Sequence, residues 1–440
     1  MKVAMIGAGY VGLVSGACFS EFGHEVICVD VDQRKVDTLL AGDVPIFEPG
    51  LEQLVAKNVA ANRLSFTTDL KAGLLDAEAV FIAVGTPSRR GGGEADLSYV
   101  YQAARDIAAA TQSEKVVVTK STVPVGTGSE VKRVLAETNP DATFHVVSNP
   151  EFLREGAAIE DFMHPNRVVC GVESEHAKQV MRELYRPLFL NETPILFTSL
   201  ESSEMIKYAA NCFLATKITF INEVADLCEK VGADVQSVAR GIGLDRRIGN
   251  LFLHPGPGFG GSCFPKDIRA LASTARAYDA PLRIVETVNE INESRKRAMA
   301  EKIIMAMGGD VSGRTLAVLG VTFKPNTDDM RESPSLDIIP ALQEAGANIR
   351  ATDPEGMGEA KPLLPGVVWC DDPYEAMEGA DGIAILTEWN AYRALDLDRA
   401  KVLLSAPVLV DLRNIYSLDE MRSAGFHYVS IGRDTIGAEG

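Results

Sequence analysis

Three glycines near the start of the chain narrow the choice of folds. An apolar stretch at 3–6 is followed by Gly7-Ala8-Gly9-Tyr10-Val11-Gly12, and a second apolar stretch at 25–29 ends in Asp30. Glycines in this spacing, between a strand and a helix through 13–19, let a pyrophosphate approach the helix N-terminus. An acid after the second strand accepts hydrogen bonds from the adenosine ribose. The pattern predicts a Rossmann-type unit that binds a dinucleotide.

Asp30 also bears on which dinucleotide is bound. A carboxylate there repels the 2'-phosphate of NADP, so NAD is the expected cofactor. Arg34 and Lys35 follow closely, and a cation beside the ribose leaves NADP open as the alternative.

Further strands are expected at 79–84, 116–119 and 145–148, with helical stretches between them such as 99–110. This alternation predicts a parallel, doubly wound sheet with ligands at the carboxyl ends of its strands. Polar or turn residues follow three of the strands, at 85–87, 121–124 and 149–156. Cofactor and substrate should meet there. The loop tip at 89–93 is given no role.

The middle of the chain changes character. No glycine or proline occurs between 202 and 231, and apolar residues recur at helical spacing, which predicts a long helix. Lys207 and Asn211 lie four residues apart on one face of it, and their neighbours are apolar, so we expect them to line a cavity. A second long helix is expected at 283–307.

Cys263 follows a glycine-rich segment and precedes an expected helix. The segment reads Gly258-Phe259-Gly260-Gly261-Ser262-Cys263-Phe264-Pro265-Lys266-Asp267, and Pro265 suits the first helical turn. A helix N-terminus and the nearby Lys266 both favour thiolate over thiol. Cys263 is therefore a candidate nucleophile.

After residue 309 the first pattern returns in weaker form. Strands are expected at 315–320, 347–352, 382–386 and 408–412, and a helix at 335–345, which predicts a second doubly wound sheet. Only Gly320 stands at its first turn, so a second dinucleotide is not expected. Lys324 and Arg413 follow two of the strands and could hold a diphosphate. The tail after Arg433 is expected to be disordered.

Composition bounds the remaining possibilities. A chain of 440 residues should form two or three domains, and its formal charge of -18 argues against a nucleic acid or an anionic membrane as partner. No stretch resembles a signal peptide or a membrane span, so a cytoplasmic protein is expected. Its seven cysteines show no disulfide or zinc spacing, and no metal site is predicted. The sequons at Asn191 and Asn292 are then chance matches.

These motifs together resemble the UDP-glucose/GDP-mannose dehydrogenase family of nucleotide-sugar dehydrogenases. The resemblance runs from Met1 to about Arg433, and the Cys263 segment is its most specific part. It implies two Rossmann-like domains joined by a helical segment that forms a dimer. On this chain they become an NAD-binding domain at 1–200, a central segment at 201–308 and a UDP-sugar-binding domain at 309–440.

The resemblance also implies a reaction, the four-electron oxidation of UDP-glucose to UDP-glucuronate with two NAD in succession. Cys263 would attack the aldehyde to give a thiohemiacetal and then a thioester, while Lys207 and Asn211 stabilise the substrate oxyanion. Asp267 and Thr122 would position a water, and Glu151 would aid thioester hydrolysis. Whether Lys207 or the water held by Asp267 takes the first proton stays open.

The remaining site residues follow from the same resemblance. Residues implied near NAD are Gly7, Gly9, Tyr10, Val11, Gly12, Asp30, Lys35, Thr86, Thr122, Glu155, Lys266 and Arg331. Residues implied near the UDP-sugar are Glu151, Phe152, Leu153, Lys207, Asn211, Phe252, Leu253, Phe259, Gly260, Phe323, Lys324 and Arg413. Arg247 is implied to reach across a two-fold interface to the sugar nucleotide of the other subunit.

Three alternatives share parts of this pattern. A sibling enzyme acting on GDP-mannose or a UDP-N-acetylhexosamine would carry the same catalytic residues. A two-electron hydroxyacid dehydrogenase would share the first domain but would not need Cys263. An inactive sensor of sugar nucleotides would keep both Rossmann-like domains, and the joint presence of Lys207, Asn211, Cys263 and Asp267 argues against it.

Overall fold

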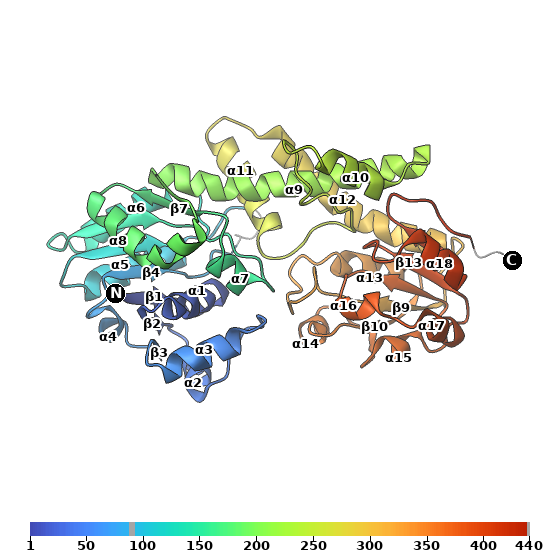
Figure 1. Cartoon of the computed structure of the whole chain (residues 1–440), viewed down its shortest axis with the longest axis horizontal. Helices are drawn as coiled ribbons and strands as arrows, with labels where there is room; N and C mark the ends of the chain where they lie inside the picture. Colours follow the sequence, from blue (N-terminus) through green and yellow to red (C-terminus); the bar gives the residue numbers. More distant parts are fainter. Residues whose placement is uncertain (88–92, 438–440) are drawn as a thin grey trace. The chain divides into compact units, whose positions relative to one another are not determined.

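The computed structural model describes residues 1–87 and 93–437 (Figure 1). The chain divides into two compact units, each described here by itself. Unit 1 comprises Met1–Ala210 with Ala270–Ala280, and unit 2 comprises Asn211–Arg269 with Pro281–Gly440. The predicted loop tip at 89–93 lies, apart from Gly93, outside the described residues.

Unit 1 is built on a sheet whose described residues form eight strands in the order β3-β2-β1-β4-β5-β6-β7-β8. All neighbouring strands are parallel except β6 and β7, which are antiparallel. The strands are β1 (Lys2–Ile6), β2 (Glu25–Val29), β3 (Leu64–Thr67), β4 (Ala79–Ile82), β5 (Lys115–Thr119), β6 (Phe144–Ser148), β7 (Val168–Val172) and β8 (Ile195–Thr198).

Helices connect these strands, and their apolar side chains cover both faces of the sheet. Alternate residues of β1 enter opposite cores, since Val3 and Met5 belong to one cluster and Ala4 to another. The helices are α1 (Tyr10–Glu21), α2 (Gln33–Ala41), α3 (Leu51–Ala60), α4 (Leu70–Leu74), α5 (Ser98–Ala110), α6 (Thr127–Thr138), α7 (Ala158–Met163), α8 (Glu175–Leu184) and the 3-10 helix η1 (Arg186–Asn191).

Unit 2 contains a second parallel sheet, which has six strands in the described residues, in the order β11-β10-β9-β12-β13-β14. Leu316 and Val318 of β9 enter one core, while Ala317 and Leu319 enter the other. The strands are β9 (Thr315–Leu319), β10 (Asn348–Thr352), β11 (Val368–Trp369), β12 (Gly382–Ile385), β13 (Val408–Asp411) and β14 (His427–Ser430).

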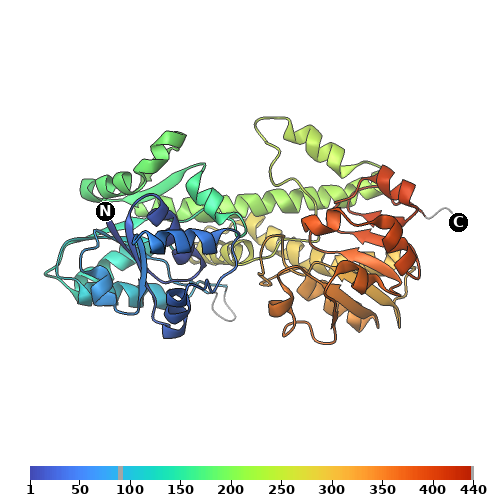
Figure 2. The ribbon, with the colours of Figure 1, turned by 60° about the horizontal axis from the view of Figure 1, so that its bottom comes forward.

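The helices of unit 2 can be followed from two sides in Figures 1 and 2. Several begin at a side-chain cap; Asp372, for example, accepts hydrogen bonds from the N–H groups of Tyr374 and Glu375. The helices are α10 (Val235–Gly243), α12 (Arg283–Ala306), α13 (Ser335–Glu344), α14 (Met357–Ala360), α15 (Pro373–Met377), α16 (Asn390–Arg393), α17 (Leu397–Leu403) and α18 (Leu418–Ala424). The unit boundary falls within α9 (Leu200–Val231) and α11 (Phe264–Ala277).

The predicted fold class is confirmed, since two doubly wound sheets and the long helix α9 are present. Two details differ. The first sheet is not wholly parallel, because β7 returns against β6. The prediction of a disordered tail is wrong for residues 434–437, where buried Ile436 pairs with Tyr428 and so fastens the end of the chain to β14. No helix among the described residues is long and apolar enough to cross a membrane.

Candidate active site

The turn after β1 is shaped to receive a ligand. Gly7 has φ of 101°, and a Cβ on Gly12 would lie 1.9 Å from the Gly7 carbonyl oxygen, so neither position accepts a side chain. Gly9 caps the N-terminus of α1 in an extended conformation, and a Cβ there would meet no atom within 4 Å. The helix start therefore has open space beside Gly9, which suits the pyrophosphate of a dinucleotide.

Asp30 lies beside this turn at the end of β2. Its carboxylate accepts hydrogen bonds from the N–H groups of Ala8 (2.8 Å) and Asp32 (3.0 Å) and from Lys35 Nζ (2.9 Å). Burial acts to raise the pKa of Asp30, but these hydrogen bonds outweigh it and hold the pKa below its usual value. Lys35 is thus a partner of Asp30, and the carboxylate stays ionised beside the expected ribose position.

Glu48, which the sequence analysis missed, links the turn to the predicted substrate segment. Its carboxylate accepts hydrogen bonds from the Tyr10 hydroxyl and from the N–H groups of Gly156 (2.6 Å) and Ala158 (2.7 Å). Tyr10 and Glu155, both predicted near NAD, come close enough to interact electrostatically. No motif singled out Glu48, because its donors lie 38 and about 110 residues away in the sequence.

Two other predicted cofactor residues meet at the carboxyl ends of β4 and β5. The Thr86 hydroxyl donates to the Thr122 carbonyl oxygen over 3.0 Å. The geometry brings these residues together as the sequence predicted, and their contact with NAD stays a prediction.

A buried ion pair joins the substrate segment to α9. Lys207 Nζ lies 3.0 Å from Glu151 Oε1 and 5.3 Å from the centroid of the Phe152 ring. The other oxygen of Glu151 accepts from the N–H of Leu153. Lys207, Glu151, Phe152 and Leu153, all predicted near the sugar, are therefore in one place within unit 1.

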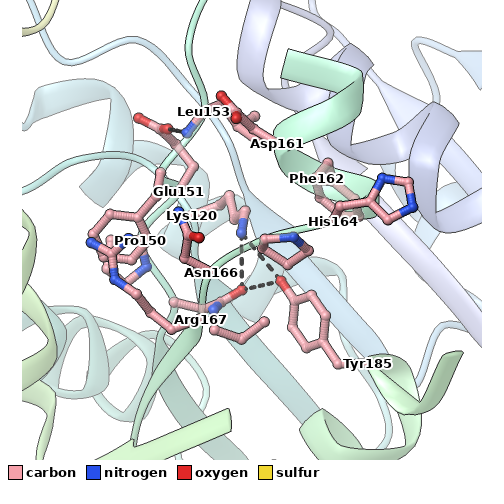
Figure 3. Close-up of a pocket in the computed structure, with 14 residues that line it drawn as sticks. Lys120, Pro150, Glu151, Leu153, Asp161, Phe162, His164, Asn166, Arg167 and Tyr185 are labelled. Carbon is pink, nitrogen blue, oxygen red and sulfur yellow. Dashed lines mark hydrogen bonds between the residues drawn. The ribbon is translucent and has the colours of Figure 1, made fainter. Parts of the chain in front are cut away.

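A pocket opens beside this group, and Lys120 is one of the residues that line it (Figure 3). Lys120 Nζ donates to Asn149 Oδ1 (3.1 Å) and to the Tyr185 hydroxyl (3.2 Å). Complete burial lowers the pKa of Lys120 to about 8, although Glu151 acts in the opposite direction. The sequence analysis passed over Lys120, since a lysine at a strand end is ordinary until its burial is known.

Unit 2 holds the predicted nucleophile. Cys263 precedes α11, and its carbonyl oxygen accepts the N–H of Asp267 over 2.9 Å. Asp267 is buried and accepts from Asn211 Nδ2 (2.6 Å) and Lys266 Nζ (2.7 Å). The structure therefore brings Asn211, Lys266 and Asp267 together beside the start of this helix, and the roles given to them stay predictions.

The seven cysteines differ in exposure. Within the described residues no disulfide joins them, Cys263 is half-buried and the other six are buried. Burial raises the pKa of each buried thiol, to about 12 for Cys28, Cys170 and Cys212. Cys263 is consequently the thiol that a substrate can reach.

The segment before Cys263 is clamped by side chains that the sequence analysis did not identify. Asn292 of α12, 3% exposed, accepts from the N–H of Phe259 (2.8 Å) and donates to its carbonyl oxygen (3.0 Å). Gly256 is held likewise, by Asn222 at its N–H and Arg295 at its oxygen. A Cβ on Gly260 would lie 2.2 Å from the carbonyl oxygen of Glu332, so the segment is also confined on its other side.

Phe323 and Arg413 adjoin this segment at the carboxyl edge of the second sheet. A Cβ on Gly261 would lie 2.8 Å from the Phe323 ring, over which Lys324 Nζ stands at 5.1 Å. Arg413 donates to the carbonyl oxygens of Leu386 (2.7 Å) and Phe323 (3.0 Å) and pairs with Glu388. Arg413 therefore fixes the surrounding loops, in addition to any contact with a diphosphate.

Among the other predicted residues of unit 2, Arg331 meets this segment, because its carbonyl oxygen accepts the N–H of Gly261 over 2.8 Å. Arg331 bonds Asp329, and Arg247, whose side chain is 89% exposed, bonds Asp245. Phe252, with φ of 62°, lies 6.2 Å from Phe264, and Leu253 is buried. The roles given to these residues stay predictions.

Comparisons with known proteins identify this arrangement. Three models of the UDP-glucose/GDP-mannose dehydrogenase family match the chain: the NAD binding domain over residues 1–189, the central domain over 201–294 and the UDP binding domain over 317–418. The UDP-glucose 6-dehydrogenase of Rhizobium meliloti is 63% identical over 435 residues, covering 98% of this chain and 100% of that protein.

Two further relatives agree. UDP-glucose 6-dehydrogenase TuaD of Bacillus subtilis is 50% identical over 99% of this chain and 94% of its own length. A solved UDP-glucose dehydrogenase from Pyrobaculum islandicum superposes with a TM-score of 0.90 at 37% identity, over 98% of both chains.

Proposed function

Because the chain belongs to the UDP-glucose/GDP-mannose dehydrogenase family, we propose that it is a UDP-glucose 6-dehydrogenase that forms UDP-glucuronate with NAD. The observation that carries the proposal is the position of Cys263, a reachable thiol at the start of α11 beside the Asn211–Asp267 pair. A two-electron dehydrogenase does not need that thiol. An enzyme that oxidises an alcohol to an acid does, because the thiol holds the intermediate aldehyde covalently.

The residues present fit NAD. The open position at Gly9 leaves room for the pyrophosphate, and the ionised Asp30 disfavours a 2'-phosphate. Tyr10, Val11, Thr86, Thr122 and Glu155 would complete this side of the site. Held there, NAD would supply the hydride acceptor for each of the two oxidations.

The chain's own residues would handle the sugar. Cys263 adds to the aldehyde and later leaves the thioester as water enters, so its sulfur is regenerated. Lys207 and Asn211 stabilise negative charge on the substrate oxygen, and Asp267 with Thr122 holds a water that moves protons. Glu151 assists thioester hydrolysis, with the ion pair to Lys207 keeping its carboxylate in place.

One assay tests the proposal against its alternatives. We expect two NADH for each UDP-glucose consumed, measured over a panel that includes GDP-mannose and the UDP-N-acetylhexosamines. A ratio of one would contradict acid formation, and no turnover with any sugar would favour a sensor. A higher kcat/KM for another nucleotide sugar would assign the chain to a sibling activity.

We also propose that the enzyme is a homodimer. On α9, the side chains of Phe213, Phe220 and Leu227 recur every seven residues and are 67%, 53% and 60% exposed. An apolar stripe at this spacing suits packing against a second helix. Leu244, Ile248 and Leu251 extend the exposed apolar surface around Arg247.

Arg247 would cross that interface to the sugar nucleotide of the other subunit. Arg247→Ala and Cys263→Ala should each be inactive or badly impaired as homodimers. Coexpressed, they form mixed dimers in which one site carries both lesions and the other none, so about a quarter of all sites is intact if pairing is random. Purified mixed dimers without activity would contradict a shared site.

Three expectations from the sequence stay predictions. They are a cytoplasmic location, the lack of a nucleic-acid or membrane partner, and the division into domains at 1–200, 201–308 and 309–440.

A further inference from the structure

A cluster of two histidines and a glutamate lies at the amino ends of β5 and β6. Glu114 precedes β5, His145 is the second residue of β6, and His176 lies in the first turn of α8. One ligand atom from each lies within 4.8 Å of the other two. The catalytic groups predicted for unit 1 follow the opposite, carboxyl ends of these strands, so the cluster is separate from them.

The framework holds these side chains together. Val116 and His145 are direct partners in the β5–β6 ladder, which places Glu114 and His145 as diagonal neighbours on one face. His145 Nε2 lies 2.7 Å from Glu114 Oε1, and the two imidazole rings are 4.9 Å apart between centroids. Since α8 packs on β6 and β7, and Glu114 directly precedes β5, all three ligands belong to a single unit.

We propose that Glu114, His145 and His176 bind Zn2+. Two imidazole nitrogens and one carboxylate oxygen are a common zinc ligand set, with a water in the fourth position. The nitrogen ligands favour zinc over magnesium or calcium, which prefer oxygen alone. When the metal binds, it takes the place of the proton between His145 Nε2 and Glu114 Oε1. That proton moves to His145 Nδ1 or is released to solvent.

The charges around the cluster have opposing effects on the binding of a cation. The N-terminus of α8 disfavours a cation near His176, which costs about two- to fivefold in affinity. Against this, the Glu114 carboxylate lies 2.7 Å from His145 Nε2 and offers an oxygen ligand of opposite charge to the cation. Solvent reaches the cluster through Glu114, whose side chain is 54% exposed, while that of His145 is 20% exposed.

Zinc titration by calorimetry tests the site. The protein should carry Cys263→Ala, because a reachable thiol also binds zinc. We expect one zinc per chain with micromolar affinity, and a higher melting temperature in its presence. His145→Ala and His176→Ala should each weaken binding by at least about tenfold, and Glu114→Gln by several-fold.

His164 supplies a matched control. It also pairs with a glutamate, Glu160, over 3.0 Å, but among the described residues this pair belongs to no cluster of three possible metal ligands. His164→Ala should leave zinc affinity unchanged. The proposal is overturned if zinc does not bind, if His176→Ala binds as tightly as the parent, or if His164→Ala is equally impaired. Circular dichroism without metal shows whether each variant is folded.

Discussion

The turn after β1 and the turn after β9 occupy the same place in two sheets whose first six strands share one order. At Gly9 of the first turn a side chain would point into open space. Gly320 of the second turn corresponds to Gly7, and a side chain would clash at either position. At the place of Gly9 the second turn has Thr322, which is buried and whose carbonyl oxygen accepts from the Thr387 hydroxyl. The first turn leaves room for a phosphate, and the second is filled by the protein itself.

The acids that follow the second strand of each sheet differ in the same way. Asp30 receives two backbone hydrogen bonds and one lysine. Asp353 is buried, and its oxygens accept six hydrogen bonds, from the N–H groups of Val321, Thr322, Glu355 and Gly356 and from the side chains of Thr322 and Trp389. Equal topology therefore does not give equal ligands, because the chemistry of the turn decides whether a nucleotide can enter.

If unit 1 holds the cofactor and unit 2 the reacting thiol, Cys263→Ala should have the largest effect. We expect UDP-glucuronate formation to be abolished while the binding of UDP-glucose and NAD, measured by calorimetry, is retained. The six other thiols are buried and cannot substitute. Undiminished acid formation by this variant would refute covalent catalysis.

Asn292→Leu should impair the reaction of UDP-glucose, which depends on unit 2, without affecting the binding of NAD by unit 1. It leaves the N–H and carbonyl of Phe259 unpaired and loosens the segment before Cys263, so kcat/KM for UDP-glucose should fall by about 100-fold. The KM for NAD should not change. Asn289→Leu, on the same helix and only half-buried, is the control. An equal rise in both KM values would mean that the clamp is not specific to the sugar side.

The two acids give the most direct test of the comparison. Asp30→Ala should raise the KM for NAD about tenfold and relax the discrimination against NADP, with little loss of stability. Asp353→Asn should leave that KM unchanged but lower the free energy of unfolding by about 2–4 kcal/mol, because an amide cannot accept all six hydrogen bonds. The comparison fails if Asp353→Asn impairs NAD binding at full stability.

The smallest effect is a pH dependence that originates in unit 1. The pKa of Lys120 is about 8 when folded and near its ordinary value when unfolded, so the unfolded chain binds more protons between these values. Stability should therefore rise with pH, by about 1 kcal/mol between pH 8 and 9, relative to Lys120→Met. Urea unfolding at both pH values measures it, and equal slopes for the two proteins would contradict the burial of Lys120.

The sequence predicted the regular parts of the molecule because their patterns are local. Gly7 to Gly12, the apolar run of α9 and the helix after Cys263 each carry a signal within a few turns or strands. It did not identify β3, β7, β8, β11 or β14; in the described sheets four of these are edge strands, and β7 adjoins the edge strand β8. The antiparallel direction of β7 relative to β6 could not be predicted either, because the direction of a strand depends on its pairing partner and not on its composition.

The residues of the candidate site also differ in whether their signal is local. Lys207 with Asn211, and Lys266 with Asp267, were predicted because the members of each pair are close in sequence. Glu48, Asn292 and His176 were not, because each acts through partners more than 30 residues away. Asn292 was noticed only as a sequon, and its burial against Phe259 gives it a structural explanation.

Unit 1 is not continuous along the chain, since it includes residues 270–280 of the region that otherwise belongs to unit 2. During synthesis unit 1 is complete only after about 70 further residues have followed Ala210, and their translation takes roughly 4 to 14 seconds. For that time its other parts lack a segment with which they pack. A fragment that ends at residue 210 would keep that gap permanently, so the cofactor domain is better produced within the full chain.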